Sequence, residues 1–250
     1  MGAHAGHRRR TAAGAALAHR AGRRGGRPTV SFAGFPDEGL VFYEGLEADN
    51  SKTFWTTHKH DYEAHVRTPM LQLLEELAPE FGTAKMFRPY RDVRFSHDKT
   101  PYKTHQGAVV NPEGRGAGAW YVQVDADGLM VAGGCWRLES DQIARYRRAV
   151  ADAVQGPALE AEVGRLRAAG WDIAGDRLVR VPAGHSADDD RIDLLKHKAL
   201  HASRRWTPED WLHTREALDR VRRSWRDLET LNAWFADNVG ATTKEPRPRR

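Results

Sequence analysis

An Asp-Gly pair at positions 127 and 128, with a strand-like segment on each side, decides much about the fold of this chain. Residues 120–126 and 129–136 are rich in valine and aromatic residues, and Asp-Gly readily adopts the backbone of a two-residue hairpin turn. The apolar side of such a hairpin needs a covering layer, which helices predicted before and after it can supply. We therefore expect an α+β fold, in which an antiparallel sheet built from hairpins is covered by N-terminal and C-terminal helices.

The expected helices follow from apolar residues spaced three and four apart. One begins at Asp37 and a second near Asn50-Ser51, which can cap it, and Pro69 is expected to kink or divide the second. Gly133-Gly134 predicts close approach of another backbone or a ligand, or else a bulge. Later helices are predicted at 139–154, 158–169, 191–201 and 207–240, the last as one helix or two joined near Asp227, with short strands at 171–174 and 178–182.

The positive charge of the chain is concentrated at its two ends. The formal net charge is +5, but residues 1–28 carry seven arginines and no acid, and residues 242–250 add a net +3. Subtracting both leaves −5 for residues 29–241, which weakens a nucleic-acid function based on overall charge. We expect a disordered basic extension at 1–28, a single α+β domain at 29–241, and a disordered tail at 242–250.

The first 28 residues share features with targeting segments. Arg8-Arg9-Arg10 precedes an alanine-rich stretch, as in a signal peptide, and the acid-free composition also fits a transit peptide. The apolar part is short and has one leucine, so we favour an extension without a targeting role. No stretch approaches the roughly 20 apolar residues of a membrane span, and the single cysteine, Cys135, fits a reducing compartment. The expected location is cytoplasmic, without membrane attachment.

Residues 86–105 are the most highly charged part of the expected domain, and we interpret them as a strand, a turn and a returning strand. Alternation over residues 86–95 puts Arg88, Asp92 and Arg94 on one face, whereas Arg91 falls among apolar positions and needs a carboxylate or carbonyl partner. Arginine and lysine bind phosphate or carboxylate, and Asp92 could orient one of the arginines. The predicted ligand-binding residues are Arg88, Arg91, Asp92, Arg94, Lys99, Tyr102, Lys103 and His105.

Three kinds of function fit this cluster. The first is a pocket for an anionic small molecule, with His97 and His105 able to exchange protons if the protein is an enzyme. The second is a nucleic-acid-binding module, which needs a positive strip with stacking aromatics such as Tyr90 and Trp120. The third is a structural or interaction domain with an internal arginine–aspartate network. The sequence has no Walker loop, nucleophile elbow, Rossmann glycine pattern or HExxH motif, so it assigns neither catalytic residues nor a cofactor, and both stay unknown at this point.

The histidines do not form a recognisable metal motif. His58, His60 and His65 belong to a predicted helix, where a solvated face explains them. His197 and His201 are four residues apart in the predicted helix 191–201, but no third ligand is evident. We expect no metal site.

Residues 88–102 resemble the hallmark motif of domain-of-unknown-function family 2461, a bacterial and fungal family of conserved hypothetical proteins. The resemblance extends over roughly residues 32–239 and implies a single soluble intracellular domain, but it supplies no activity. A usual member starts near Phe32, which makes residues 1–28 an addition. The matching positions are Arg88-x-x-Arg91-Asp92-x-Arg94-Phe95-x-x-x-Lys99-x-Pro101-Tyr102, supported by Phe35-Pro36, Asn50, Phe54-Trp55, Gly133-Gly134-x-Trp136, Val181-Pro182 and Asp193-Leu194-Leu195-x-His197-Lys198.

Overall fold

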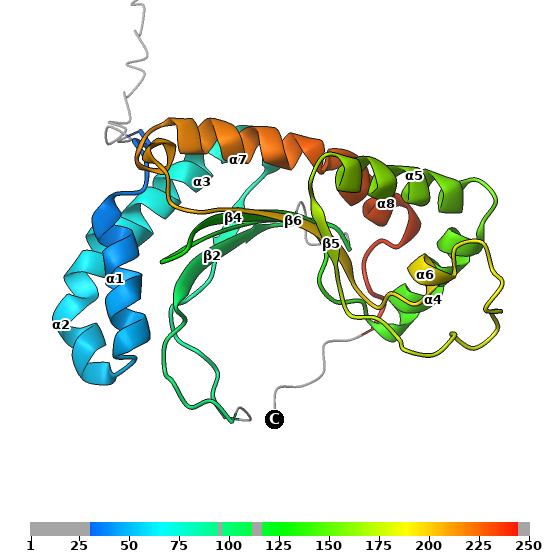
Figure 1. Cartoon of the computed structure of the whole chain (residues 1–250), viewed down its shortest axis with the longest axis horizontal. Helices are drawn as coiled ribbons and strands as arrows, with labels where there is room; N and C mark the ends of the chain where they lie inside the picture. The colour runs from blue at the N-terminus through cyan, green and yellow to red at the C-terminus, as the bar shows by residue number, and fades with distance from the viewer. Residues whose placement is uncertain (1–30, 95–96, 112–116, 245–250) are drawn as a thin grey trace, which may run out of the picture.

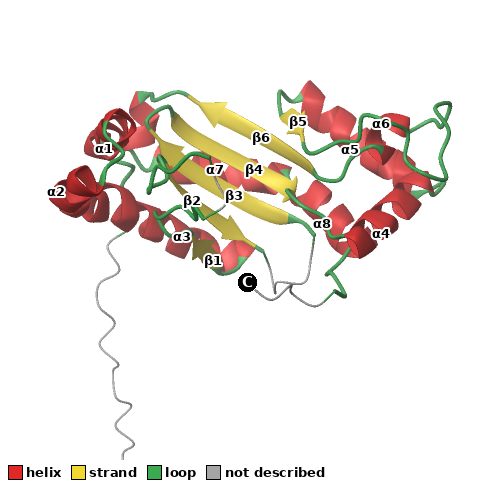
Figure 2. Cartoon of the chain, turned by 90° about the horizontal axis from the view of Figure 1, so that it is seen from below, coloured by secondary structure: helices red, strands yellow, loops and turns green. Residues whose placement is uncertain are grey.

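A computed structural model of the chain describes residues 31–94, 97–111 and 117–244. Within these residues, six strands form one antiparallel sheet in the order β1-β2-β3-β4-β6-β5 (Figure 2). The strands are β1 (Ala84–Met86), β2 (His105–Val110), β3 (Ala119–Asp125), β4 (Gly128–Cys135), β5 (Asp172–Ala174) and β6 (Leu200–Trp206). The predicted extension at 1–28 lies outside the described residues. Of the predicted tail, Thr242, Thr243 and Lys244 are described, and the two threonines hydrogen-bond the Asp141 carboxylate.

The helices cover one face of the sheet and both of its ends. In Figure 1, α3, α7 and α8 lie over one face, α1 and α2 stand at one end, and α4 and α6 stand at the other. This arrangement confirms the predicted α+β fold. The helices are α1 (Asp37–Ala48), α2 (Lys52–Tyr62), α3 (Thr68–Phe81), α4 (Ser140–Ala151), α5 (Gln155–Ala168), α6 (Ile192–Leu195), α7 (Glu216–Asp227) and α8 (Glu229–Asn238).

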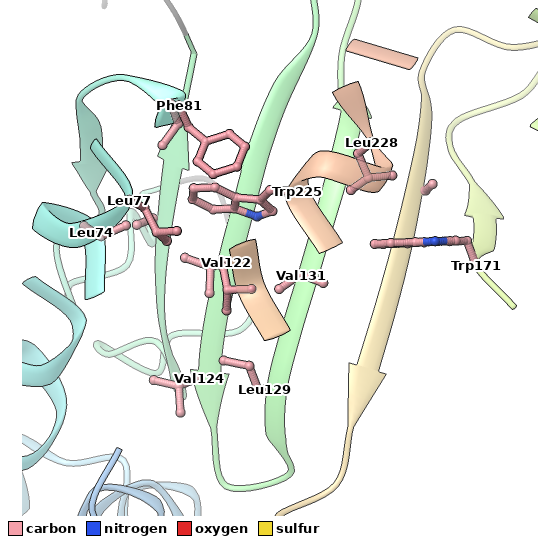
Figure 3. Packing of buried hydrophobic residues seen from close by; sticks show 14 of the residues in the cluster. Leu74, Leu77, Phe81, Val122, Val124, Leu129, Val131, Trp171, Trp225 and Leu228 are labelled. Atoms are coloured by element: carbon pink, nitrogen blue, oxygen red, sulfur yellow. The ribbon is translucent and has the colours of Figure 1, made fainter. Parts of the chain in front are cut away.

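The covered face is packed by aliphatic side chains of the central hairpin against aromatic side chains of the helices (Figure 3). Val122 and Val131 are fully buried there, as is the indole of Trp225, whose ring centre lies 5.2 Å from that of Phe81. Trp225 Nε1 donates to the Tyr121 carbonyl at 3.1 Å, so the helix layer is also hydrogen-bonded to the sheet. Burial of a side chain of this size is worth several kcal/mol, typically about 3–5 on truncation to alanine.

The central hairpin forms as predicted, with its turn one residue earlier. Asp125 pairs with Gly128, so Ala126 and Asp127 are the turn residues, and Gly128 begins β4 with φ of 109°. The predicted close approach at the double glycine is also present, since a Cβ on Gly134 would lie 2.6 Å from the Leu200 carbonyl oxygen.

The predicted strand over residues 86–95 is wrong beyond Met86. Residues 87–94 and 97–104 instead form an irregular hairpin, which we call the arginine hairpin. Its isolated bridge pairs Tyr90 with Tyr102, and Arg91 N and Lys103 N donate to the prolines at 101 and 89 at 2.9 and 2.8 Å. Proline has no N–H to return either bond, so a regular ladder cannot continue.

The predicted helix at 191–201 is also wrong. Only α6 is helical there, and the chain then enters β6, which lies between β4 and β5. The strand predicted at residues 178–182 is absent from the structure. The preceding residue, Arg177, forms an isolated bridge with His197. Between Thr207 and Gly240 the alternative with two helices is confirmed, because Leu228 separates α7 from α8. No helix in the described ranges has both the length and the apolar character needed to cross a membrane.

Candidate functional site

Four of the predicted ligand-binding residues surround one open hollow on the arginine hairpin. Arg88, Arg91, Asp92 and Arg94, together with Val93, line a cavity of about 730 Å³. A cavity of this volume is in the range of small-molecule sites. In Figure 1 the hairpin extends from the side of the sheet that is opposite the helix layer.

Two of these arginines already have carboxylate partners within the hairpin. The Arg91 guanidinium donates from Nη1 to the Asp98 carboxylate and to the Thr100 hydroxyl. Arg94 donates to Asp92 through Nε at 2.9 Å and through Nη2 at 2.6 Å. The hydrogen bonds from Arg94 lower the pKa of Asp92 to about 2. Because these pairs are open to water, they contribute little to stability, and their main effect is to fix the arginine rotamers.

Lys99 and Tyr102 hold the hairpin in shape. The Lys99 ammonium donates to the Val93 carbonyl at 3.0 Å, across the hairpin. Tyr102 is buried, and its ring stacks on Trp55 with centres 4.5 Å apart. The Asn50 side chain accepts from Tyr102 N at 3.1 Å and donates to the Tyr102 carbonyl at 3.0 Å. Tyr102 therefore anchors the hairpin to the helices, and it does not line the hollow.

Arg88 and Lys103 are cations of a different kind. Neither side chain has a hydrogen bond or an ion pair with another residue in the described part of the chain. The Lys103 ammonium lies 5.0 Å from the centre of the Phe87 ring, and burial and the Arg88 charge both lower the pKa of Lys103. Two positive charges held near each other repel, and an anion between them would remove that repulsion.

His105 is the first residue of β2, two positions after Lys103, and it pairs with Asp125 of β3. Burial lowers the pKa of His105, and the Lys103 charge lowers it further, whereas Asp125 acts in the opposite direction. The imidazole is therefore neutral at pH 7 and can take up a proton.

A hydrogen-bonded network on the open face of β3 was not predicted from the sequence. Tyr121 Oη donates to Gln123 Oε1 at 2.7 Å, and Gln123 Nε2 donates to Asp125 Oδ2 at 2.6 Å. Arg205 of β6 completes the network with bonds of 2.7 and 2.9 Å to the two Asp125 oxygens. Burial raises the pKa of Tyr121 to about 12, so its hydroxyl remains a donor. The alternation of Tyr121, Gln123 and Asp125 along β3 could have indicated this network from the sequence. The contribution of Arg205 could not be foreseen, because β6 was not predicted as a strand.

A row of aromatic rings crosses the same open face, and we call it the ring row. The ring centres are 6.3 Å apart between Phe87 and Tyr121, 5.6 Å between Tyr121 and Trp136, and 4.9 Å between Trp136 and His201. Figure 2 shows this face of the sheet, which none of the described helices crosses. The row joins strands that are far apart in sequence, from the arginine hairpin to β6.

The histidines considered as metal ligands are placed separately. His58 stacks on Phe54 with ring centres 4.4 Å apart, and His197 Nδ1 bonds the Ala199 carbonyl at 2.8 Å. In the part of the chain that can be described, no three histidine, cysteine or acidic side chains gather as a metal site requires.

Comparisons with known proteins place the chain in a family without supplying an activity. The family model described as "Conserved hypothetical protein (DUF2461)" matches residues 38–234, which confirms the resemblance seen in the sequence. Neither the curated proteins nor the solved structures contain a match to this chain. Because the matched region is well over half of the sequence, the chain belongs to the DUF2461 family of conserved hypothetical proteins.

Proposed function

We propose that this domain binds a small organic anion, carrying a phosphate or a carboxylate, in the hollow of the arginine hairpin. Arg88, which lines the hollow, and Lys103, whose ammonium is close enough to Arg88 for that charge to lower its pKa, are the groups that hold its charge. The observation that carries the proposal is charge balance, since Arg91, Arg94 and Arg205 have carboxylate partners while Arg88 and Lys103 have none among the described residues. A phosphate or carboxylate oxygen between them would supply the missing negative charge.

The paired residues support the same role. Arg91 donates both of its hydrogen bonds from Nη1, and a guanidinium carries five N–H donors, so Nε and Nη2 can bind a ligand. Asp98 and Asp92 hold the two paired arginines in fixed rotamers, which lowers the entropy lost on binding. His105, two residues after Lys103 and close enough for the Lys103 charge to lower its pKa, is the group that a reaction at this site would use to exchange a proton.

A small anion fits the hairpin better than a nucleic acid. A nucleic acid needs a continuous strip of positive charge along its backbone. On the arginine hairpin, Asp92 and Asp98 alternate with the arginines and already bind two of them. The remaining positive charge is local, as a single anionic group requires.

Thermal unfolding in the presence of inorganic phosphate and citrate tests the proposal. We expect both anions to raise the midpoint of the wild type and to have little specific effect on Arg88→Ala and Lys103→Ala. At a hundredfold excess over Kd, binding stabilises by about 2.7 kcal/mol, or roughly 5–10 °C for a domain of this size. Without anion, Arg88→Ala should unfold at the wild-type midpoint, because Arg88 is exposed and makes no hydrogen bond or ion pair with the described residues.

The control is Arg148→Ala on α4. The Arg148 side chain is also exposed and also lacks a hydrogen bond or ion pair within the described ranges. Phosphate and citrate stabilise most proteins by exclusion from the surface, so only the difference between Arg88→Ala and Arg148→Ala reports binding. Equal stabilisation of all variants would contradict the proposal, and a lower midpoint of Arg88→Ala without anion would favour a structural role.

A further inference from the structure

We propose that the anion of this site also carries a planar ring, and that the ring stacks on Trp136 of the ring row. The ligand class is then a phosphate or carboxylate whose aryl or heterocyclic ring is joined to the anionic group by a spacer, since Phe87 and Tyr121 lie between Lys103 and Trp136 in the row. The inference rests on the proposed function and adds the chemical nature of the ligand beyond its charge.

The open face differs in composition from an ordinary exposed sheet face. A sheet face without a helix layer usually carries polar side chains that are solvated. Here four rings lie across it, from Phe87 through Tyr121 and Trp136 to His201, with each ring close to the next. An aromatic surface of this kind outside the core is typical of a binding surface.

The geometry of Trp136 suits a stacking surface. Its indole lies parallel to the His201 ring, at 11° and 4.9 Å, yet the residue keeps 41% of its surface exposed. His201 Nδ1 is buried and has no hydrogen-bond partner among the described residues, so the imidazole supports the indole by stacking. Trp136 is therefore held in place on one side and open to a ligand on another.

The strands beside Trp136 carry short side chains on the open face. Tyr121 pairs with Ala132 of β4, and Ala132 pairs with Ser203 of β6, so side chains on this level of the sheet are short beyond the tyrosine. At Gly107, a Cβ would lie 2.3 Å from Tyr121 Oη, so the absence of a side chain there lets the tyrosine lie over β2. Short side chains leave the open face to the rings.

The ring row begins at the cationic residues of the arginine hairpin. Lys103 lies over Phe87, the first ring of the row, and the pKa of Lys103 is sensitive to the Arg88 charge. The cationic site and the ring row therefore meet at Phe87. An anion bound by Arg88 and Lys103 would direct the rest of its molecule along the row toward Trp136.

Two matched pairs of probes test the inference, 5-phenylpentyl phosphate against pentyl phosphate and 6-phenylhexanoate against hexanoate, because a chain is needed to carry the ring past Phe87 and Tyr121 to Trp136. Within each pair the anionic group is the same and only the ring differs. Titration calorimetry should show that the ring-bearing member of at least one pair binds about fivefold or more tightly, the lower limit for one stacked ring. In Trp136→Ala the ratio should fall to near one, while the affinity for the ringless member is unchanged.

Tyr90→Ala is the matched control, because Tyr90 is 48% exposed, belongs to the arginine hairpin and is not part of the ring row. It should keep the wild-type ratio, and loss of the ratio in Tyr90→Ala but not in Trp136→Ala would overturn the inference. If Trp136→Ala does not fold, Trp136→Leu replaces it, since leucine keeps bulk without a ring. If both members of each pair bind equally, and this binding still depends on Arg88 and Lys103, the stacking on Trp136 is refuted while the proposed anion site stands. Absence of binding by all four probes, or binding unaffected by Arg88→Ala and Lys103→Ala, would refute the proposed function itself.

Discussion

Replacing Asn50 by alanine should loosen the arginine hairpin while leaving the sheet and the helix layer intact. The Asn50 side chain bonds both backbone groups of Tyr102, at 3.1 and 3.0 Å, and Tyr102 is only 4% exposed. Each bond contributes about 0.5–1.5 kcal/mol, and a buried group left unpaired costs about 1–3 kcal/mol. We expect Asn50→Ala to lower the free energy of unfolding by about 2–4 kcal/mol, and the thermal midpoint by about 5–15 °C.

Thermal unfolding and hydrogen exchange of the Tyr102 amide measure the two parts of this effect. Asn238→Ala is the control, because Asn238 makes a single bond within its own helix, to the Trp234 carbonyl at 2.9 Å. Asn50→Asp should be intermediate, since aspartate keeps the acceptor for Tyr102 N but loses the donor to its carbonyl. The reasoning is refuted if Asn50→Ala costs no more than Asn238→Ala and the Tyr102 amide exchanges at the wild-type rate.

Further predictions concern the thiol, the open face and the pH dependence. Burial raises the pKa of Cys135 to about 11, so this thiol should react with Ellman's reagent only after unfolding, as comparison of native and guanidinium-treated protein will show. Gly107→Ala should displace Tyr121 and cost about 1 kcal/mol; urea denaturation should find a smaller cost when Tyr121→Phe is already present, and an equal cost would argue against the contact. The pKa of His105 lies below its ordinary value of 6.5, so the unfolded chain takes up the proton first as the pH falls. Its contribution to stability should therefore be present above pH 6.5 and be lost below it, and His105→Gln should reduce this loss in urea denaturation at about pH 5.

The hairpin of β3 and β4 could be predicted because its information is local. The turn residues and the flanking valines are contiguous, and the favoured pairing follows from them. Strand β6 could not be predicted in this way. Leu194, Leu195 and Leu200 have the spacing of a helix, and the sequence of β6 has no β-branched residue. It becomes a strand because the edge of β4 is available to pair with it, which is a tertiary effect.

The candidate site was partly predictable for the same reason. Arg88, Arg91, Asp92 and Arg94 lie within seven positions, so their clustering in one hollow was visible as a charged motif. Tyr102 was expected to bind a ligand, but a tyrosine in a charged segment can equally be the anchor that holds it. The ring row was not predicted, because Phe87, Tyr121, Trp136 and His201 come together only through the register of five strand segments.

A crystal structure of the protein soaked with 5-phenylpentyl phosphate tests the central claim most directly. The account predicts phosphate oxygens within hydrogen-bond distance of Arg88 and Lys103. The rival position is a hollow of about 460 Å³ between β6 and α7, lined by Arg204, Arg220, Arg223 and Arg226 among others. Phosphate bound there, with the arginine hairpin empty, would contradict the account.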